Sequence, residues 1–261
     1  MTELTPLDTA HAPMDAAPDD AAARLRFYER LADSELFLLL EGEAVGDNLS
    51  PEMFEVEGVK YVLVFDTEAR LADFVDGGAH HAALSGRVVA KMLAGQGLGL
   101  GVNLGVAPSS ILLPPDALVW LADMLQNAPE EVMERPVAFY APKGGEQGLL
   151  QAIDSKLATA AGLADAAYLV TVEYDDGRQG LLLAIIDALP AAHGALATAV
   201  AEVVMFGVDE TGLDVAFFAA SDTVCATLAK VGLRFDLPKR EVEAQAPAAP
   251  GRDPNSPPIL R

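Results

Sequence analysis

The fold of this protein is decided by a stretch in its second half, AAYLVTVEYDDGRQGLLLAIID at residues 166–187. Two apolar runs, Ala166–Glu173 and Leu181–Asp187, lie on either side of the pair Asp176-Gly177. Short apolar runs joined through an Asp-Gly pair are typical of a β-hairpin. The stretch therefore predicts two paired antiparallel strands.

Helices and strands alternate on both sides of this hairpin. The segments expected around it are a strand at Val137–Tyr140, a helix at Gln147–Ala160, a helix at Ala191–Phe206, a strand at Leu213–Ala219 and a helix at Asp222–Val231. Gly207 and Gly232 follow the last two helices, where glycine commonly ends a helix. The order β-α-β-β-α-β is similar to a split βαβ arrangement, in which two helices pack on one face of a sheet.

The first half mixes helices and strands in the same way. Asp20 stands where a helix cap belongs, Thr67 stands before a second helix, and Pro115 opens a third. The other expected segments are a helix at Arg87–Leu93 and strands at Glu35–Leu40, Phe54–Glu57, Val59–Phe65, Leu98–Val102 and Ser110–Leu113. The sequence therefore predicts an α/β fold of the α+β kind in both halves.

Composition predicts two tandem domains between unstructured ends. A chain of 261 residues is long for one domain. Residues 1–19 lack hydrophobic periodicity and residues 237–261 contain six prolines, so we expect a disordered arm and a disordered tail. Prolines and glutamates interrupt the pattern at 128–136. We expect a linker there, between domains at 20–127 and 137–236.

The charge of the chain limits its partners. Its formal net charge is −22, and acidic residues outnumber basic ones in both halves. Because nucleic acids and anionic membranes are bound largely through Lys and Arg, we expect neither as a partner. No apolar run approaches the ~20 residues that cross a bilayer, and residues 1–19 lack the features of a signal peptide. The single cysteine, Cys225, fits a reducing compartment, so the expected location is the cytoplasm.

Five segments together resemble the enhanced serine sensitivity (SseB) family of bacterial proteins. They are Phe27–Leu31, Tyr61–Thr67, Gly99–Gly105, Ala166–Val170 and Gly180–Ile186. The resemblance runs over roughly residues 24–235 and implies both the N-terminal and the C-terminal domain of that family, in a cytoplasmic protein. It implies no reaction. One departure is Leu104, which follows Asn103 where family members often have proline, so the family's turn geometry is not carried over.

Four polar residues are the candidate ligand-binding residues. Asp66 follows a strand, and ligands of α/β proteins bind at the carboxyl ends of strands, although the same residue can instead help to start the next helix. Asn103 ends the strand after it. The adjacent pair His80 and His81 cannot easily share a metal ion, because neighbouring side chains diverge, so surface histidines are the favoured interpretation. We expect no metal site.

No motif for a cofactor or a nucleophile is found in the sequence. Gly97, Gly99 and Gly101 alternate with other residues, which indicates a strand and not a dinucleotide-binding loop. Their bare face is explained either by close packing or by the approach of a ligand, with Asn103 presenting its amide. Cys225 lies among apolar residues without a basic cluster, so we expect a small core residue and not a reactive thiolate.

Two functions from different classes remain. The leading interpretation is a non-enzymatic interaction or regulatory module, whose sheet edges and acidic surface meet a protein partner. The alternative is an enzyme of unfamiliar type or a small-molecule sensor, with Asp66, His80, His81 and Asn103 gathered at the domain interface. A pocket that collects at least three of these residues would favour the alternative. The sequence leaves the oligomeric state open.

Overall fold

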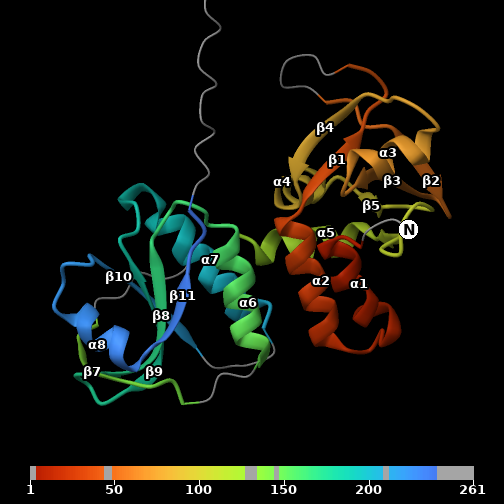
Figure 1. Ribbon diagram of the computed structural model, residues 1–261. Coiled ribbons are helices and arrows are strands. Elements are labelled where there is room, and N and C mark those ends of the chain that lie inside the picture. Colours follow the sequence, from red (N-terminus) through yellow and green to blue (C-terminus); the bar gives the residue numbers. More distant parts are fainter. Residues whose placement is uncertain (1–3, 44–48, 127–133, 144–146, 208–211, 240–261) are drawn as a thin grey trace, which may run out of the picture.

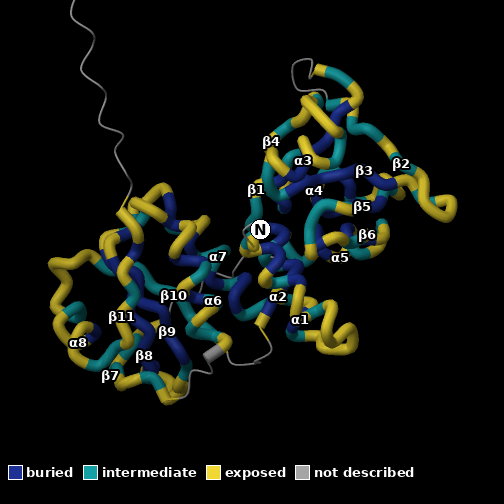
Figure 2. Tube along the Cα trace, turned by 45° about the vertical axis from the view of Figure 1, so that its right-hand side comes forward, coloured by how far each residue is buried: buried dark blue, intermediate teal, exposed yellow. Residues whose placement is uncertain are grey.

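The chain forms two sheets, and helices cover each of them (Figure 1). The computed structural model describes residues 4–43, 49–126, 134–143, 147–207 and 212–239. The α+β class predicted from the sequence is confirmed, with one sheet in each half of the chain. Figure 2 shows that the central strands β3, β8 and β9 are buried.

The first sheet is mixed, with the strand order β4-β1-β3-β5-β6 and with β2 paired to β3. Its strands are β1 (Glu35–Leu39), β2 (Met53–Val56), β3 (Val59–Phe65), β4 (His81–Ser85), β5 (Leu98–Val102) and β6 (Ile111–Leu113). All of them except β4 were expected from the sequence. Strands β3 and β5 are parallel neighbours, so their carboxyl ends lie side by side.

Helices cover both faces of this sheet. One core lies between the sheet and helices α1, α2, α4 and α5, and a smaller core lies between the other face and α3. The helices are α1 (Pro6–Ala16), α2 (Ala21–Asp33), α3 (Glu68–Val75), α4 (Gly86–Leu93) and α5 (Pro115–Met124). The caps expected at Asp20 and Thr67 are confirmed, because each side chain accepts a hydrogen bond from a first-turn backbone N–H.

Helix α1 corrects one prediction. The composition of residues 1–19 predicts a disordered arm, and this is wrong for residues 6–16. Thr5 and Asp8 form a capping box at the start of the helix, and Leu7 is 1% exposed in the first core. A composition rule misses such a helix, because a short helix is stabilised mainly by the tertiary contacts of a few residues.

The second sheet has the strand order β10-β9-β8-β11, and β7 also pairs with β8. Its strands are β7 (Pro136–Tyr140), β8 (Ala166–Tyr174), β9 (Gln179–Ile186), β10 (Leu213–Phe218) and β11 (Leu233–Asp236). The predicted hairpin is confirmed as β8 and β9, antiparallel from Ala166–Ile186 to Glu173–Gln179. Strand β11 was not expected. The parallel strands β9 and β10 are direct neighbours, whereas in a split βαβ unit another strand lies between them.

Helices also cover both faces of the second sheet. Helices α6 (Gln147–Ala158) and α7 (His193–Met205) pack on one face, and α8 (Val224–Val231) packs on the other. A short 3₁₀ helix, η1 (Pro190–Ala192), leads into α7. Side chains on both faces of β8 and β9 are therefore buried, which explains why the deciding stretch is apolar at nearly every position.

The predicted ends of the domains are only partly covered by the described residues. Most of the expected linker, 128–136, lies outside them, so the division into two domains stays a prediction. The tail expected at 237–261 is wrong at its start, because Leu237 is 5% exposed in the second core. Residues 240–261 lie outside the described part. Among the described residues, none of the helices has the length and apolar character needed to cross a membrane.

Candidate functional site

Asp66 and Asn103 meet at the carboxyl ends of β3 and β5. The backbone N–H of Asp66 donates to Asn103 Oδ1 at 3.0 Å, and the Asn103 N–H donates to the carbonyl oxygen of Val64 at 2.9 Å. Asn103 Nδ2 donates to Ser109 Oγ at 2.8 Å. Asn103 is 0% exposed and has a left-handed backbone with φ of 49°. Both ends of its amide are therefore bonded inside the protein.

A buried guanidinium extends this contact into a network. Arg70 Nη1 donates to Asp66 Oδ1 at 2.7 Å and to Asp8 Oδ1 at 3.2 Å, and Arg70 Nη2 makes a short hydrogen bond to Asp8 Oδ2. Ser109 Oγ donates to Asp8 Oδ1 at 2.6 Å, and Thr5 Oγ1 donates to Asp66 Oδ2 at 2.6 Å. The side chains of Arg70, Asp8 and Asp66 are at most 5% exposed. The network therefore fastens α1 over the carboxyl ends of β3 and β5.

Two groups of this network, Asp8 and Arg70, are held in their charged forms. Burial raises the pKa of the Asp8 carboxyl, but the hydrogen bonds from Arg70 and Ser109 outweigh it and hold that pKa well below its usual range. Burial lowers the pKa of Arg70, but the hydrogen bonds and charges of Asp8 and Asp66 outweigh it, so the net pKa is raised. A network that is buried and bonded internally offers no free group to a ligand. Its role is to hold α1 in place.

Four members of the network were not predicted from the sequence, namely Thr5, Asp8, Arg70 and Ser109. Two signals could have shown the first three. Thr5 and Asp8 have the spacing of a capping box, and Arg70 follows Asp66 at a spacing of four. Ser109 carries no local signal, because its partner Asp8 lies 101 residues away in the sequence.

The two histidines do not join Asp66 and Asn103. His80 and His81 are both exposed, and His81 begins the edge strand β4. His81 Nε2 lies 3.4 Å from Glu68 Oε1, and its ring meets the ring of Phe37 edge to face. The structure therefore brings together two of the four candidate residues. In the part of the chain that the structure describes, no group of three or more His, Cys, Asp or Glu residues could hold a metal ion.

Close packing explains the bare face of β5. A Cβ atom added to Gly99 would lie 2.3 Å from Tyr61 Cε1, and one added to Gly101 would lie 2.6 Å from Leu63 Cδ2. Both gaps are far shorter than a van der Waals contact. Gly97 has a different role, because it precedes the strand with a positive φ of 69°. The packing interpretation of Gly99 and Gly101 is confirmed.

The described residues around Cys225 disfavour activation of its thiol. Burial and the nearby carboxylates of Asp222 and Asp187 raise the pKa of this thiol. The thiol donates to the carbonyl oxygen of Ala219 at 3.2 Å. A raised pKa disfavours the nucleophilic thiolate form, in agreement with the expectation from the sequence.

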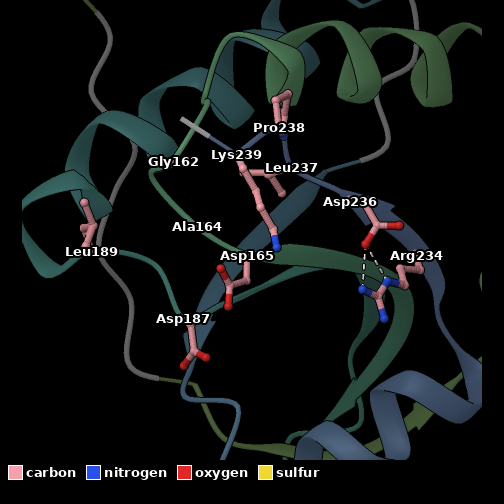
Figure 3. Close-up of a pocket in the computed structure, with 10 residues that line it drawn as sticks. All are labelled: Gly162, Ala164, Asp165, Asp187, Leu189, Arg234, Asp236, Leu237, Pro238 and Lys239. Carbon is pink, nitrogen blue, oxygen red and sulfur yellow. Dashed lines mark hydrogen bonds and ion pairs between the residues drawn. The ribbon is translucent and has the colours of Figure 1, made fainter. Parts of the chain in front are cut away.

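A polar cavity of about 800 Å³ lies in the second half (Figure 3). Its charged lining residues are Asp165, Asp187, Arg234, Asp236 and Lys239, none of which was a candidate. Asp187 follows β9 and Asp236 ends β11, so the cavity lies at the carboxyl ends of two strands that run in the same direction. Asp187 could have been noticed from the sequence by the reasoning applied to Asp66, because it directly follows a buried strand.

The charges around this cavity are partly paired. Arg234 Nη2 lies 2.6 Å from Asp236 Oδ1. Asp187 has a left-handed backbone with φ of 50°, and its Oδ1 accepts a hydrogen bond from the N–H of Ala220 at 2.8 Å. Figure 3 shows the Lys239 side chain pointing toward Asp165. The cavity therefore presents both signs of charge to solvent.

A cluster of five charged side chains joins the two halves, and the sequence did not predict it. It contains Glu29 and Asp33 from α2, Arg87 from α4, Lys156 from α6 and Glu202 from α7. Lys156 Nζ lies 2.6 Å from Asp33 Oδ2, 2.7 Å from Glu202 Oε2 and 3.5 Å from Glu29 Oε1. Arg87 Nη1 lies 2.9 Å from Glu202 Oε1, and Arg87 Nη2 lies 2.7 Å from Asp33 Oδ1. We call these five residues the junction cluster.

Burial and pairing act in opposite directions on the acids of the junction cluster. Burial raises the pKa of Glu202, but hydrogen bonds from Arg87 and Lys156 outweigh it, so the net pKa is lowered. Burial raises the pKa of Glu29 more than the charge of Lys156 lowers it, so this pKa is raised. The other acid of the cluster, Asp33, is 14% exposed at its side chain.

Aromatic packing accompanies these ion pairs. Phe206, which follows α7, is 1% exposed and lies in the core of the first half. Its ring centroid lies 6.5 Å from that of Trp120 on α5, which in turn lies 5.1 Å from Tyr28 on α2. The two halves therefore share apolar as well as ionic contacts.

Residues 11–120 match the family model of the SseB protein N-terminal domain. The match begins within α1, ends within α5 and so covers the first sheet, which confirms the resemblance for this part of the chain. No curated protein is significantly similar to the chain. No solved structure is significantly similar either.

Proposed function

We propose that this protein is a non-enzymatic interaction or regulatory module, which meets a protein partner through its acidic surface. The observation that carries the proposal is where the charge lies. The buried charged residues of the described chain are Asp8, Arg70, Lys156 and Glu202, two of each sign. Their charges cancel, so the excess of acidic over basic side chains among the described residues lies outside the core. Such a field attracts positively charged surfaces and repels nucleic acids and anionic lipids.

The contacts between the two halves support this proposal. The junction cluster and Phe206 connect the halves through ionic and apolar contacts. Because the two halves are already held together, they need not be fixed relative to each other when a large partner binds the acidic surface. Binding then costs less conformational entropy, which favours affinity.

Two finer assignments belong to the same proposal. Residues 137–236 form the C-terminal domain that the resemblance to the SseB family implies, and the protein acts in the cytoplasm. Support for the first is the pair of segments Ala166–Val170 and Gly180–Ile186, which lie in the central hairpin β8-β9. Fractionation of the native cell tests the location, and recovery of the protein with membranes would contradict it.

The proposal is tested by affinity purification from the cell in which the protein occurs. The full chain is the bait, and an unrelated acidic protein of similar net charge is the control bait. We expect a protein that only the full chain retains and that rising salt releases, because surface charge attraction is screened by ions. If the two baits retain the same proteins at every salt concentration, the proposal is wrong.

A second candidate function, small-molecule sensing, is favoured by one observation, the cavity lined by Asp165, Asp187 and Lys239. The four residues first expected for such a site do not line it. The test is a thermal-shift screen of small charged compounds with the Asp187→Asn variant. Asp76→Asn is the matched control, because Asp76 also has a positive φ, of 53°, and does not line the cavity. A stabilising compound whose effect is lost only in Asp187→Asn would favour the sensor.

A further inference from the structure

Strand β10 has a free edge. It pairs with β9 in parallel over all six residues, from Leu213–Leu181 to Phe218–Ile186. It is the last strand of the second sheet, and among the described residues no strand pairs with its other side. In a parallel pair, every second residue directs its backbone N–H and C=O away from the neighbour. The outer side of β10 therefore presents a row of backbone donors and acceptors.

Apolar side chains flank this row on both faces of the sheet. Leu213, Val215 and Phe217 pack beside the α6–α7 core, and Ala216 and Phe218 pack beside the α8 core. All six residues of β10 are half-buried, so each keeps some contact with solvent. An added strand would cover this remaining apolar surface while it paired with the backbone.

The only charged residue of β10, Asp214, is already engaged. Its Oδ2 accepts a hydrogen bond from Tyr174 Oη at 2.7 Å and lies 3.1 Å from Arg178 Nη2. The edge thus lacks the lysines, prolines and bulges that protect exposed strands from pairing. Two other edges carry such protection. Strand β7 begins with Pro136 and has a shift of register, and β6 has three residues.

Acidic groups lie at both ends of β10. Near its start, Asp214 and Glu134 share the cation Arg178, which leaves one negative charge in excess there. Two further carboxylates adjoin its end. The N–H of Asp187 donates to the Phe218 carbonyl oxygen at 2.9 Å, and Asp222 Oδ2 accepts a hydrogen bond from the N–H of Ala219 at 2.9 Å. A segment that docks here therefore meets negative charge before and after the apolar strand.

We infer that the free edge of β10 binds an extended segment of a second protein, with apolar side chains at alternating positions and Lys or Arg on both sides of them. This inference rests on the proposed interaction function and names the surface that performs it. Unpaired strand groups are satisfied best by another extended chain, and alternating apolar residues would lie over the two faces. A second copy of this chain is disfavoured, because two molecules of net charge −22 repel each other.

The test uses the full chain and a synthetic probe, a short peptide with lysines at both ends and alternating valine and threonine between them. Hydrogen exchange on the full chain, with and without the probe, locates the binding. We expect slower exchange of backbone amides within Leu213–Phe218. Strand β4, the edge strand His81–Ser85 of the first sheet, is the internal control and should not change.

Two altered probes show whether the backbone and the charge carry the binding. N-methylation of alternate residues along one edge of the peptide removes its hydrogen-bond donors, and we expect at least about tenfold weaker binding. Replacement of the lysines by glutamates should weaken binding by about tenfold or more at low salt. Neither altered probe puts the folding of the protein at risk.

The inference is overturned if the lysine probe does not bind, if it protects residues other than β10, or if the N-methylated probe binds equally well. It is also overturned if the protein self-associates with β10 protected, since the occupant is then a second copy. These outcomes are separate from the fate of the proposed function. A partner captured from cells that leaves β10 exchange unchanged would keep the function and remove this surface. Probe binding without any cellular partner would keep the edge and remove the function.

Discussion

Replacement of Lys156 by methionine should weaken the contact between the two halves. The change keeps most of the side-chain volume and removes the cation that lies within 3.5 Å of Glu29, Asp33 and Glu202. Loss of one partner from a buried ion pair costs about 3–5 kcal/mol, because the remaining charge stays buried. Glu202 is 2% exposed, but the side chains of Asp33 and Glu29 are 14% and 15% exposed and can recover water. We therefore expect the lower end of this range, about 3 kcal/mol.

Urea titration measures this cost. For a chain of this size a loss of about 3 kcal/mol corresponds to a midpoint lower by about 1 M urea. The only tryptophan, Trp120, lies at the contact with Phe206, so its fluorescence reports on the junction while circular dichroism reports on the whole chain. Lys91→Met is the matched control, because Lys91 is an exposed lysine on α4, and its effect should stay within about 0.5 kcal/mol.

A double-mutant cycle separates the ionic contribution from the loss of packing. Glu202→Gln alone leaves Arg87 and Lys156 with fewer acids. The double variant Lys156→Met/Glu202→Gln should be more stable than the sum of the two single losses predicts, by about 1–3 kcal/mol. Strictly additive effects, or a Lys156→Met protein as stable as the wild type, would refute the reasoning, because the cluster would then be open and hydrated in solution.

Four further results are expected. Gly99→Val should lower the free energy of unfolding by about 1–3 kcal/mol in urea titration, because its side chain overfills the space beside Tyr61, whereas Gly148→Ala, which meets open space, should not destabilise the protein. The pKa of Asp8 is lower in the folded than in the unfolded state, so the carboxylate stabilises the fold at neutral pH, and this stabilisation is lost as the pH falls below about 4. The Asp8→Asn variant should therefore be less stable than the wild type at pH 7 and lose less stability on acidification. Stability profiles against pH that run parallel for the two proteins would contradict this. At ~150 mM salt the protein should not bind duplex DNA, single-stranded RNA or anionic vesicles, and micromolar binding in a titration would remove the charge argument. Limited proteolysis should cut first near both ends and then around Glu130–Arg135, leaving two resistant fragments. A single core without cleavage in that segment would overturn the two-domain prediction.

The second half was largely predictable because its signals are local. The hairpin β8-β9 follows from two apolar runs and one Asp-Gly pair, and the ends of α7 and α8 follow from the glycines after them. Strand β11 was missed although Leu233–Asp236 alternate between apolar and polar residues, as a half-buried strand does, because the pattern runs over only four residues. Its pairing with β8 cannot be seen in a local pattern.

The polar interior was not predictable, because its partners are distant in sequence. Arg87 and Glu202 are 115 residues apart, and Asp8 and Ser109 are 101 residues apart. A single sequence shows that such residues are charged or polar, but it does not show which of them meet. The candidates Asp66 and Asn103 are neighbours because they follow and end two adjacent parallel strands. Their burial under α1 depends on Asp8, which is distant in the sequence.

The position of α1 has a consequence for any ligand at the end of the first sheet. This end is the usual ligand-binding edge of an α/β sheet, and here the helix occupies it through Asp8 and Arg70. Because the helix is part of the same chain, its effective concentration at Arg70 is in the millimolar range or above and does not change on dilution. A soluble anion that competes with Asp8 for Arg70 must therefore overcome this high effective concentration of the helix. The first half of the protein thus behaves as a complex that is already saturated with its own internal ligand.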